Sequence, residues 1–179
     1  MAPIPVRKLL PCSSWVLIVK GVFLLTTTYI ASNATVVGDV VLKENANIWY
    51  GAVLRGDHGT ITVGESSNIQ DNAVVHEKTT IGNFCTIGHS AIVHGCTIRD
   101  YCLIGMGAIV LDGAILGNHC MVGAGALVTG KTDAPDGSLL LGSPAKIVRS
   151  LTPEEISGLE KNAQDYVNHA EAQLPHITK

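Results

Sequence analysis

Three histidines lie within one short stretch, HEKTTIGNFCTIGHSAIVHG, which covers residues 76 to 95 and is otherwise built mainly of small and aliphatic residues. They are His76, His89 and His94. Neutral imidazole is a common ligand of protein-bound transition metals. For one histidine alone an exposed turn position is the simpler explanation, whereas three together are either exposed turn histidines or the ligands of a metal site.

The residues around the histidines follow a six-residue period. Aliphatic side chains return at every sixth position in three runs, with a small residue four positions after most of them. The runs are Ile30, Val36, Leu42, Ile48 and Leu54; then Val63, Ile69, Val75, Ile81, Ile87 and Val93; then Ile98, Ile104, Val110, Leu116, Val122 and Val128. This period predicts an all-β solenoid, a parallel β-helix of hexapeptide repeats in which three short strands make each coil.

The period slips at two places. Val63 lies nine positions after Leu54 instead of six, so we expect RGDHGT, residues 55 to 60, to bulge out as a loop. Ile98 lies five positions after Val93, which predicts a tight corner at HGC. Irregular positions in a regular scaffold are where functional residues tend to lie.

The repeat also predicts which histidines can meet. His76 and His94 each follow an aliphatic core position, and three six-residue units, which make one coil, separate them. They should project from the same edge on adjacent coils, about 4.8 Å apart, and so reach one ion. His89 falls near an edge between different faces, so a third ligand would have to be His89 of a neighbouring chain. This arrangement predicts a cyclic homotrimer with identical sites at its interfaces.

A helix is predicted near the C-terminus. Thr152 can cap it, Pro153 suits the first helical position, and Glu155 completes a capping box. An apolar stripe at helical spacing should pack on the prism or on a partner subunit. It consists of Ile156, Leu159, Ala163, Val167, Ala170 and Leu174. We therefore predict a β-helix domain over residues 1–150 and a C-terminal helix within 151–179.

The N-terminal segment, residues 1–29, is included in that domain. Arg7 and Lys8 followed by WVLIVKGVFLL resemble a secretion signal. The apolar run is short for a membrane span and is interrupted by Lys20, and no clear cleavage site follows. We expect it to belong to the fold, with secretion as the alternative, and we expect no membrane partner.

Composition narrows the partners and the compartment. The chain of 179 residues is 46% hydrophobic but only 4% aromatic, and its net charge is −3 with no basic stripe, which argues against nucleic acid. Its five cysteines include no C-x-x-C pair and indicate reduced thiols in the cytoplasm. We expect Cys85, Cys102 and Cys120 to be small buried fillers.

The sequence resembles the γ-class carbonic anhydrases and their short bacterial relatives. The resemblance runs from about Ile30 to Arg149 and rests on RGD at 55–57, NIQDNAVVH at 68–76 and GHSAIVHG at 88–95. It implies a left-handed β-helix that assembles as a trimer, although the general rule for parallel crossovers would give the opposite hand.

The resemblance also implies an activity and a ligand set. His76 and His94 of one subunit and His89 of the next would hold Zn²⁺, with Fe²⁺ or Co²⁺ as alternatives. Water bound to the metal would lose a proton near pH 7, and the hydroxide would attack CO₂ to give bicarbonate, a lyase reaction. Gln70 matches the family glutamine that orients this hydroxide.

Further site residues follow from the same resemblance. Arg55 and Asp57 match an ion pair at the subunit interface, which would fix the position of His89, and we expect Asp71 to join their network. Tyr166 resembles a helix tyrosine that approaches the metal in short family members; on pattern alone it is equally a packing residue.

The sequence departs from the best-characterised γ enzymes at the proton shuttle. Only 12 residues separate His76 from His89, so the acidic loop with the glutamate shuttle has no room. His58 or Glu65 can substitute, or both can be ordinary solvated loop residues.

Two other functions stay open. Hexapeptide β-helices also serve as acyltransferases that use acyl-CoA, and GSPAKIV, residues 142–148, resembles a segment at the end of such folds. Those enzymes need one histidine and no metal triad. A non-catalytic metal-binding protein or scaffold is the other alternative.

Overall fold

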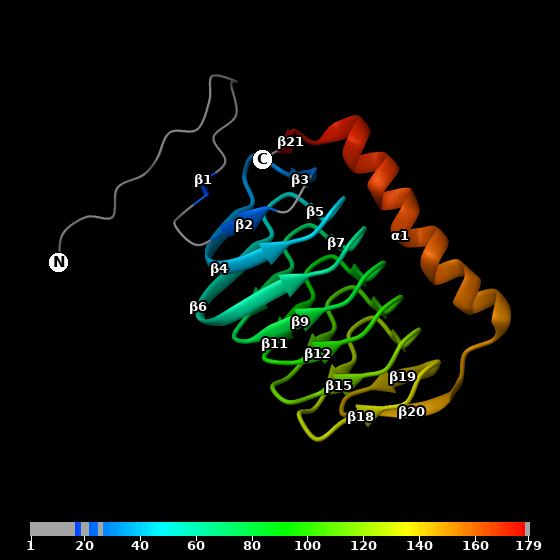
Figure 1. Ribbon diagram of the computed structural model, residues 1–179. Coiled ribbons are helices and arrows are strands. Elements are labelled where there is room, and N and C mark those ends of the chain that lie inside the picture. Colours follow the sequence, from blue (N-terminus) through cyan, green and yellow to red (C-terminus); the bar gives the residue numbers. More distant parts are fainter. Residues whose placement is uncertain (1–16, 19–21, 25–26, 178–179) are drawn as a thin grey trace.

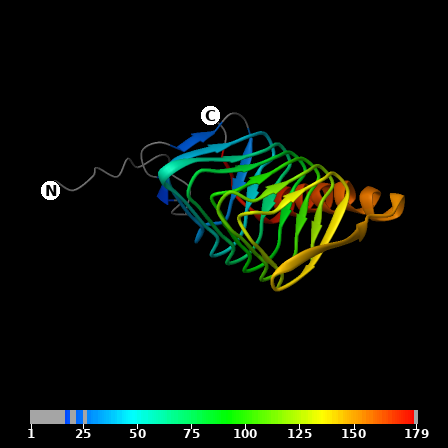
Figure 2. The same ribbon diagram turned by 90° about the horizontal axis from the view of Figure 1, so that it is seen from below.

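The chain winds into a three-sided solenoid (Figures 1 and 2), and the aliphatic residue of each six-residue unit is buried in its core. The computed structural model describes residues 17–18, 22–24 and 27–177. Every aliphatic residue of the three runs is at most 1% exposed. Burying a Val, Leu or Ile side chain contributes roughly 1.5–3 kcal/mol, so this stacked column is the main source of stability. The predicted parallel β-helix fold class is confirmed.

Two strands bend around a corner and belong to two faces. They are β4 (Thr35–Leu42) and β6 (Val53–Val63). The first face contains their first halves followed by β8 (Val74–His76), β11 (Ile92–His94), β14 (Ile109–Val110) and β17 (Leu127–Val128). The second face contains their second halves followed by β9 (Thr79–Ile81), β12 (Thr97–Ile98), β15 (Ile115–Leu116) and β18 (Asp133–Ala134).

The third face is a separate sheet. It contains β3 (Thr28–Ile30), β5 (Asn47–Ile48), β7 (Asn68–Ile69), β10 (Thr86–Ile87), β13 (Leu103–Ile104), β16 (Met121–Val122), β19 (Ser138–Gly142) and β20 (Ala145–Ser150). All pairs between successive coils are parallel, and only β19 with β20 and β21 (His176–Ile177) with β3 run antiparallel among the described strands. The chain therefore visits the third, first and second faces in turn on every coil.

The predicted loop at residues 55–60 is wrong, because this segment lies inside the continuous strand β6. Arg55 pairs with Val37 before the irregularity, and Ile61 pairs with Val40 after it. The backbone hydrogen bonds to β4 on both sides hold the extra residues in the sheet as a β-bulge. The predicted tight corner is confirmed, since the register between adjacent coils shortens by one residue between His94 and Thr97.

The predicted helix is present as α1 (Pro153–Gln173) and lies along the third face, where it contacts β5, β7 and β10 (Figure 1). Thr152 caps it, and Glu155 completes the capping box. Its buried residues are Leu159, Ala163, Val167 and Ala170. The Asn162 side chain donates a hydrogen bond to Thr86 Oγ1 at 2.8 Å, which ties the helix to β10.

The N-terminal segment is described only in part. β1 (Leu17–Ile18) and β2 (Val22–Leu24) both pair in parallel with β4. The rest of WVLIVKGVFLL, with Arg7 and Lys8, lies outside the described residues, so the division at residue 150 stays a prediction. No helix in the described part of the chain combines the length and apolar character needed to cross a membrane.

The three cysteines predicted as fillers are confirmed as buried free thiols. Cys85, Cys102 and Cys120 are each at most 1% exposed. They occupy the small position of the repeat on successive coils, where alanine stands elsewhere. A packing role explains all three.

Candidate metal centre

His76 and His94 stack on adjacent strands at the end of the first face, as predicted. They are register partners between β8 and β11. Nδ1 of His76 lies 3.1 Å from Nε2 of His94, and the ring centroids are 5.0 Å apart. Two imidazoles on one tetrahedral zinc ion, with bonds of about 2.0–2.1 Å, would place their nitrogens about 3.3 Å apart. The pair therefore has nearly the separation that a shared ion requires.

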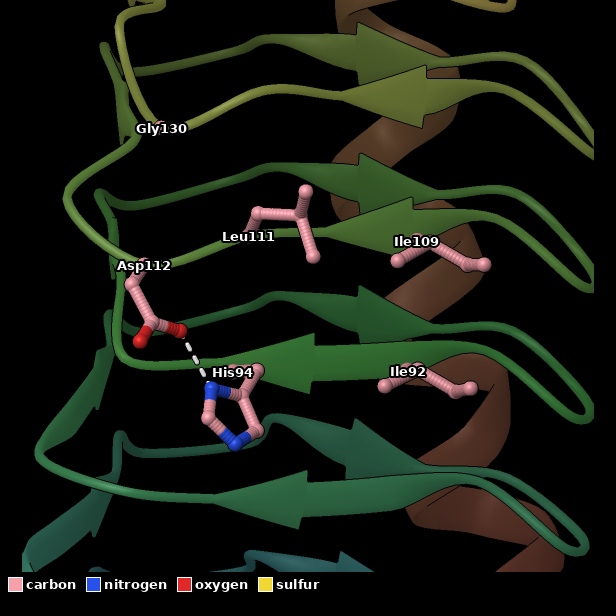
Figure 3. A pocket seen from close by; sticks show the side chains of 6 residues that line it. All are labelled: Ile92, His94, Ile109, Leu111, Asp112 and Gly130. Atoms are coloured by element: carbon pink, nitrogen blue, oxygen red, sulfur yellow. Dashed lines mark hydrogen bonds and ion pairs between the residues drawn. The ribbon is translucent and has the colours of Figure 1, made fainter.

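A carboxylate holds the other nitrogen of each ring. Nε2 of His76 lies 2.9 Å from Oδ1 of Asp57, and Nδ1 of His94 bonds Asp112 (Figure 3). When each neutral ring donates its proton to its carboxylate, the two facing nitrogens both present lone pairs. A cation between them relieves that conflict, and carboxylates in this position are typical of metal-ligating histidines.

Arg55 completes the network on the His76 side. Its NH1 lies 2.5 Å from Oδ2 of Asp57 within the same chain. The hydrogen bond from His76, followed by that from Arg55, lowers the pKa of the Asp57 carboxyl below its usual value. Asp57 is thus held as the carboxylate that orients His76. Its predicted role between subunits stays a prediction.

His89 lies at the opposite end of the first face, in the turn between β10 and β11. Its Nδ1 lies 2.8 Å from Oδ2 of Asp71, which leaves Nε2 for an ion. The extended strand β11 separates His89 from His94, because His89 precedes the strand and His94 ends it. Among the described residues, no cluster with metal-ligand spacing contains His89. The structure therefore confirms that His89 lies apart from the pair in its own chain.

Gln70 belongs to the His89 end. It is 4% exposed, its Oε1 accepts a hydrogen bond from the backbone N–H of His89 at 3.1 Å, and its Nε2 donates to Asn68 Oδ1 at 3.1 Å. Both ends of the amide are therefore engaged in holding the turn that carries His89. A direct contact of Gln70 with a metal-bound group stays a prediction.

Asp71 and Tyr166 also lie at this end. Within its own chain Asp71 bonds His89, because the turn after β7 carries it to the corner next to His89, and its place in the network of Arg55 and Asp57 between subunits stays a prediction. The Tyr166 ring packs edge-on against Trp49, with centroids 5.5 Å apart. Burial, and then the charge of Asp71, raise the pKa of the Tyr166 hydroxyl. Tyr166 therefore packs beside the His89 end, and its approach to a metal stays a prediction.

Sequence reasoning missed two carboxylates and left the role of His58 undecided. Asp112 directly follows Leu111, the residue opposite His94 on the next coil, so counting coils was a signal for it. Glu77 follows His76 in a turn and bonds His58 Nδ1 at 2.9 Å. In each of two groups, the potential ligand atoms lie within 4.8 Å of one another. The first group is Asp57, His58 and His76, and the second is His76, Glu77 and His94. Glu65, the other shuttle candidate, belongs to neither group.

A shallow apolar hollow adjoins the histidine pair. It is lined by Ile92, Ile109 and Leu111 beside His94 and Asp112, with Gly130 at its far side (Figure 3). The hollow extends along the first face toward the later coils.

The chain is similar to known proteins over most of its length. A family model described as the GMPPB C-terminal domain matches residues 57–154, which cover the solenoid from the β6 bulge to the start of α1. The chain is 47% identical over 161 residues to γ carbonic anhydrase 1, mitochondrial, of Arabidopsis thaliana, covering 84% of this chain and 58% of that protein. The chain thus spans little more than half the length of this relative.

Shorter relatives are covered almost completely. The chain is 50% identical over 146 residues to a protein of Methanocaldococcus jannaschii named "Probable carbonic anhydrase", covering 79% of this chain and 92% of that protein. The crystal structure of a hexapeptide transferase family protein from Anaplasma phagocytophilum matches with a TM-score of 0.72 and 42% identity, covering 86% of this chain and 97% of that chain. With its stacked histidines and this identity over most of its length, the chain belongs to the γ carbonic anhydrase family.

Proposed function

We propose that the protein catalyses the reversible hydration of CO₂ to bicarbonate at metal centres shared between chains of a homotrimer. The main observation behind the proposal is that each of the three histidines bonds a carboxylate. Each has one ring nitrogen on a carboxylate and keeps the other for an ion. The pairs are His76 with Asp57, His89 with Asp71, and His94 with Asp112. His58 is paired with Glu77 in the same way, and what distinguishes His76 and His94 is that their remaining nitrogens face each other at 3.1 Å.

The proposed ion is Zn²⁺, with Fe²⁺ or Co²⁺ as alternatives, because imidazole accepts all three. The site offers His76 and His94 from one chain and His89 from the next. When bound, the metal would supply Lewis-acid activation of a water molecule at neutral pH. Neutral imidazoles suit that task, since they leave the positive charge of the ion uncompensated.

The other residues of the chain prepare this site. Asp57 and Asp112 hold the tautomers and ring orientations of the pair, and Arg55 keeps Asp57 ionised. Gln70 fixes the backbone of His89. These groups act before the substrate arrives, so the centre is preorganised rather than assembled during the reaction.

The separation of the ligands within one chain is the reason to propose an assembly of chains. His89 lies at one end of the first face, and the pair at the other end, so a closed ring of chains can bring the end of one face to the next chain's corner. Three chains are proposed because the resemblance of the sequence to the γ-class enzymes implies a trimer. The cytoplasmic location predicted from the cysteines stays a prediction.

Metal analysis and a kinetic assay test the proposal together. Protein purified without chelators should contain about one ion per chain, by the count of one site per interface. It should hydrate CO₂ with Zn²⁺ or, under anaerobic conditions, with Fe²⁺. Metal-free protein that cannot be loaded with either ion would contradict the proposal.

Mixed oligomers test the shared ligand set. His89→Ala alone and His76→Ala alone should each bind no metal. When the two variants are unfolded and refolded together, interfaces that join an intact His76 to an intact His89 should regain metal and activity. No recovery in mixed trimers of verified composition would show that the ligands are not shared between chains.

An acyltransferase is the second candidate, because a structural relative at 42% identity is titled a hexapeptide transferase. Calorimetric titration with acetyl-CoA separates the two functions. Binding of acyl-CoA without metal would favour the transferase, whereas bound metal without CO₂ hydration would favour a non-catalytic relative.

A further inference from the structure

The corner between the third and first faces stacks one exposed position on successive coils. The N–H of Gly107 donates to the carbonyl of His89 at 2.8 Å, which places Met106 on the coil directly after His89. The same turn bonding relates the preceding and following coils. We name this column the His89 edge: Tyr50, Asp71, His89, Met106 and Ala124.

Met106 is the most exposed large apolar side chain of the described residues, at 59%. It stands between Gly105 and Gly107, and a Cβ at Gly107, whose φ is +65°, would meet only open space. The side chain therefore projects from the edge without lateral support from its neighbours in the chain. Burying a methionine contributes roughly 1.5–3 kcal/mol, so a partner surface would stabilise it.

The hollow beside His94 has the matching apolar character. Ile92 and Leu111 are each 38% exposed and line it together with Ile109 (Figure 3). Val110 pairs with Val93, so Leu111 lies on the coil directly after His94. The hollow thus has the same position relative to His94 that Met106 has relative to His89.

The two spacings agree residue for residue. Met106 follows His89 by the same number of positions as Leu111 follows His94. In a ring of chains with parallel prism axes, the contact that brings His89 to the pair also brings Met106 to Leu111. We propose that Met106 of one chain inserts into the hollow beside His94 of a second copy of the chain; this inference rests on the proposed metal centre.

The contact has a specific physical task. Successive coils of a solenoid are nearly alike, so two prisms can slip by one coil, about 4.8 Å, with little loss of general complementarity. Only one register places Met106 in the hollow, and that register also places His89 opposite His76 and His94. Met106 is therefore a positioning residue that selects the metal-binding register, and it covers the apolar side of the centre.

Charge substitution tests the contact in the full chain. Met106→Glu should shift the sedimentation mass from three chains to one chain of 18.8 kDa and remove the bound metal, because it places a carboxylate in an apolar hollow. Adding Leu111→Lys to Met106→Glu should restore both, since the new charges face each other between chains. Ile115→Glu is the matched control, because Ile115 is 37% exposed on the second face, and it should leave the mass unchanged.

Disulfide crosslinking tests the same contact by a measurement that depends on neither bound metal nor enzyme activity. Met106→Cys with Leu111→Cys should form covalent dimers and trimers under mild oxidation, and Met106→Cys with Ile115→Cys should not. Absence of crosslinks, or a trimeric Met106→Glu variant with full metal content, would overturn the inference. An active wild type with those results would leave the proposed function standing, whereas crosslinked trimers of an inactive, metal-free wild type would refute the function and retain the contact.

Discussion

The two ends of the first face use the same coil in different ways. At the end where β8 and β11 stop, two histidines stack in register and meet within one chain. At the end where those strands begin, successive turns carry different residues, and His89 is the only histidine among the described residues of that edge. The end of the first face that carries His76 and His94, which we call the pair end, therefore holds two of the three proposed ligands. The His89 edge holds one, and Gln70 and Asp71 fix its position.

The difference shows how a solenoid limits what one chain can build. Stacking collects groups that are one coil apart, but an extended strand holds the two ends of a face apart. A third histidine for the pair must come from elsewhere, and the His89 edge presents one whose other ring nitrogen already bonds a carboxylate. In the proposed trimer, the neighbouring chain would supply this histidine.

Removing a ligand from the pair end should have the largest effect. His94→Ala takes away one of two stacked imidazoles, and we expect metal affinity and CO₂ hydration to fall by more than ~100-fold, beyond the loss typical of outer-shell changes. Plasma emission spectrometry and stopped-flow hydration measure the two quantities. His119→Ala is the control, since His119 stacks on Tyr101 away from this face; an equal loss there would remove the special status of the pair end.

A carboxylate substitution at the pair end should have the next largest effect. Asp112→Asn keeps the size of the side chain but weakens its hold on His94 Nδ1, and metal affinity should fall about 10–100-fold. Competition with a chelator measures the change. Asp133→Asn on the second face should be neutral, and unchanged affinity in Asp112→Asn would show that His94 needs no orienting partner.

At the His89 edge, Gln70→Ala should cost about 1–3 kcal/mol of unfolding free energy, because the buried N–H of His89 and the amide of Asn68 lose partners. Urea denaturation of the metal-free protein measures this cost. Gln164→Ala, on the exposed side of α1, is the matched control. A neutral Gln70→Ala would mean that the turn carrying His89 is held by the backbone alone.

The smallest effect is expected far from both ends, at the helix cap. The hydrogen bonds from Arg149, followed by that from the Thr152 backbone, lower the pKa of Glu155 to about 2. Because the folded pKa is depressed, the stabilisation is complete above the ordinary glutamate pKa of 4.5 and is lost as pH falls toward about 2. As pH falls through this range, the melting temperature should fall slightly more for the wild type than for Glu155→Gln. Parallel curves of melting temperature against pH for the two proteins would contradict this prediction.

Much of this architecture was predictable from the sequence, because the spacing of residues along the chain determines each coil. The six-residue period set which side chains are buried, and the coil of three such units set the stacking of His76 on His94. The capping residues of α1 were readable for the same reason, as their hydrogen bonds join residues three apart. Contacts within a coil or between equivalent positions on adjacent coils depend on spacing alone.

Only the tertiary structure decided what the irregular positions do. Spacing indicated extra residues after Leu54, but the pairing of β6 with β4 on both sides made them a bulge in a strand rather than a loop. Spacing placed Asp71 beside Gln70, but only the direction of its turn showed that it bonds His89 of its own chain. The direction of a side chain at a corner depends on backbone dihedrals and on packing across coils. The sequence repeat therefore does not predict it.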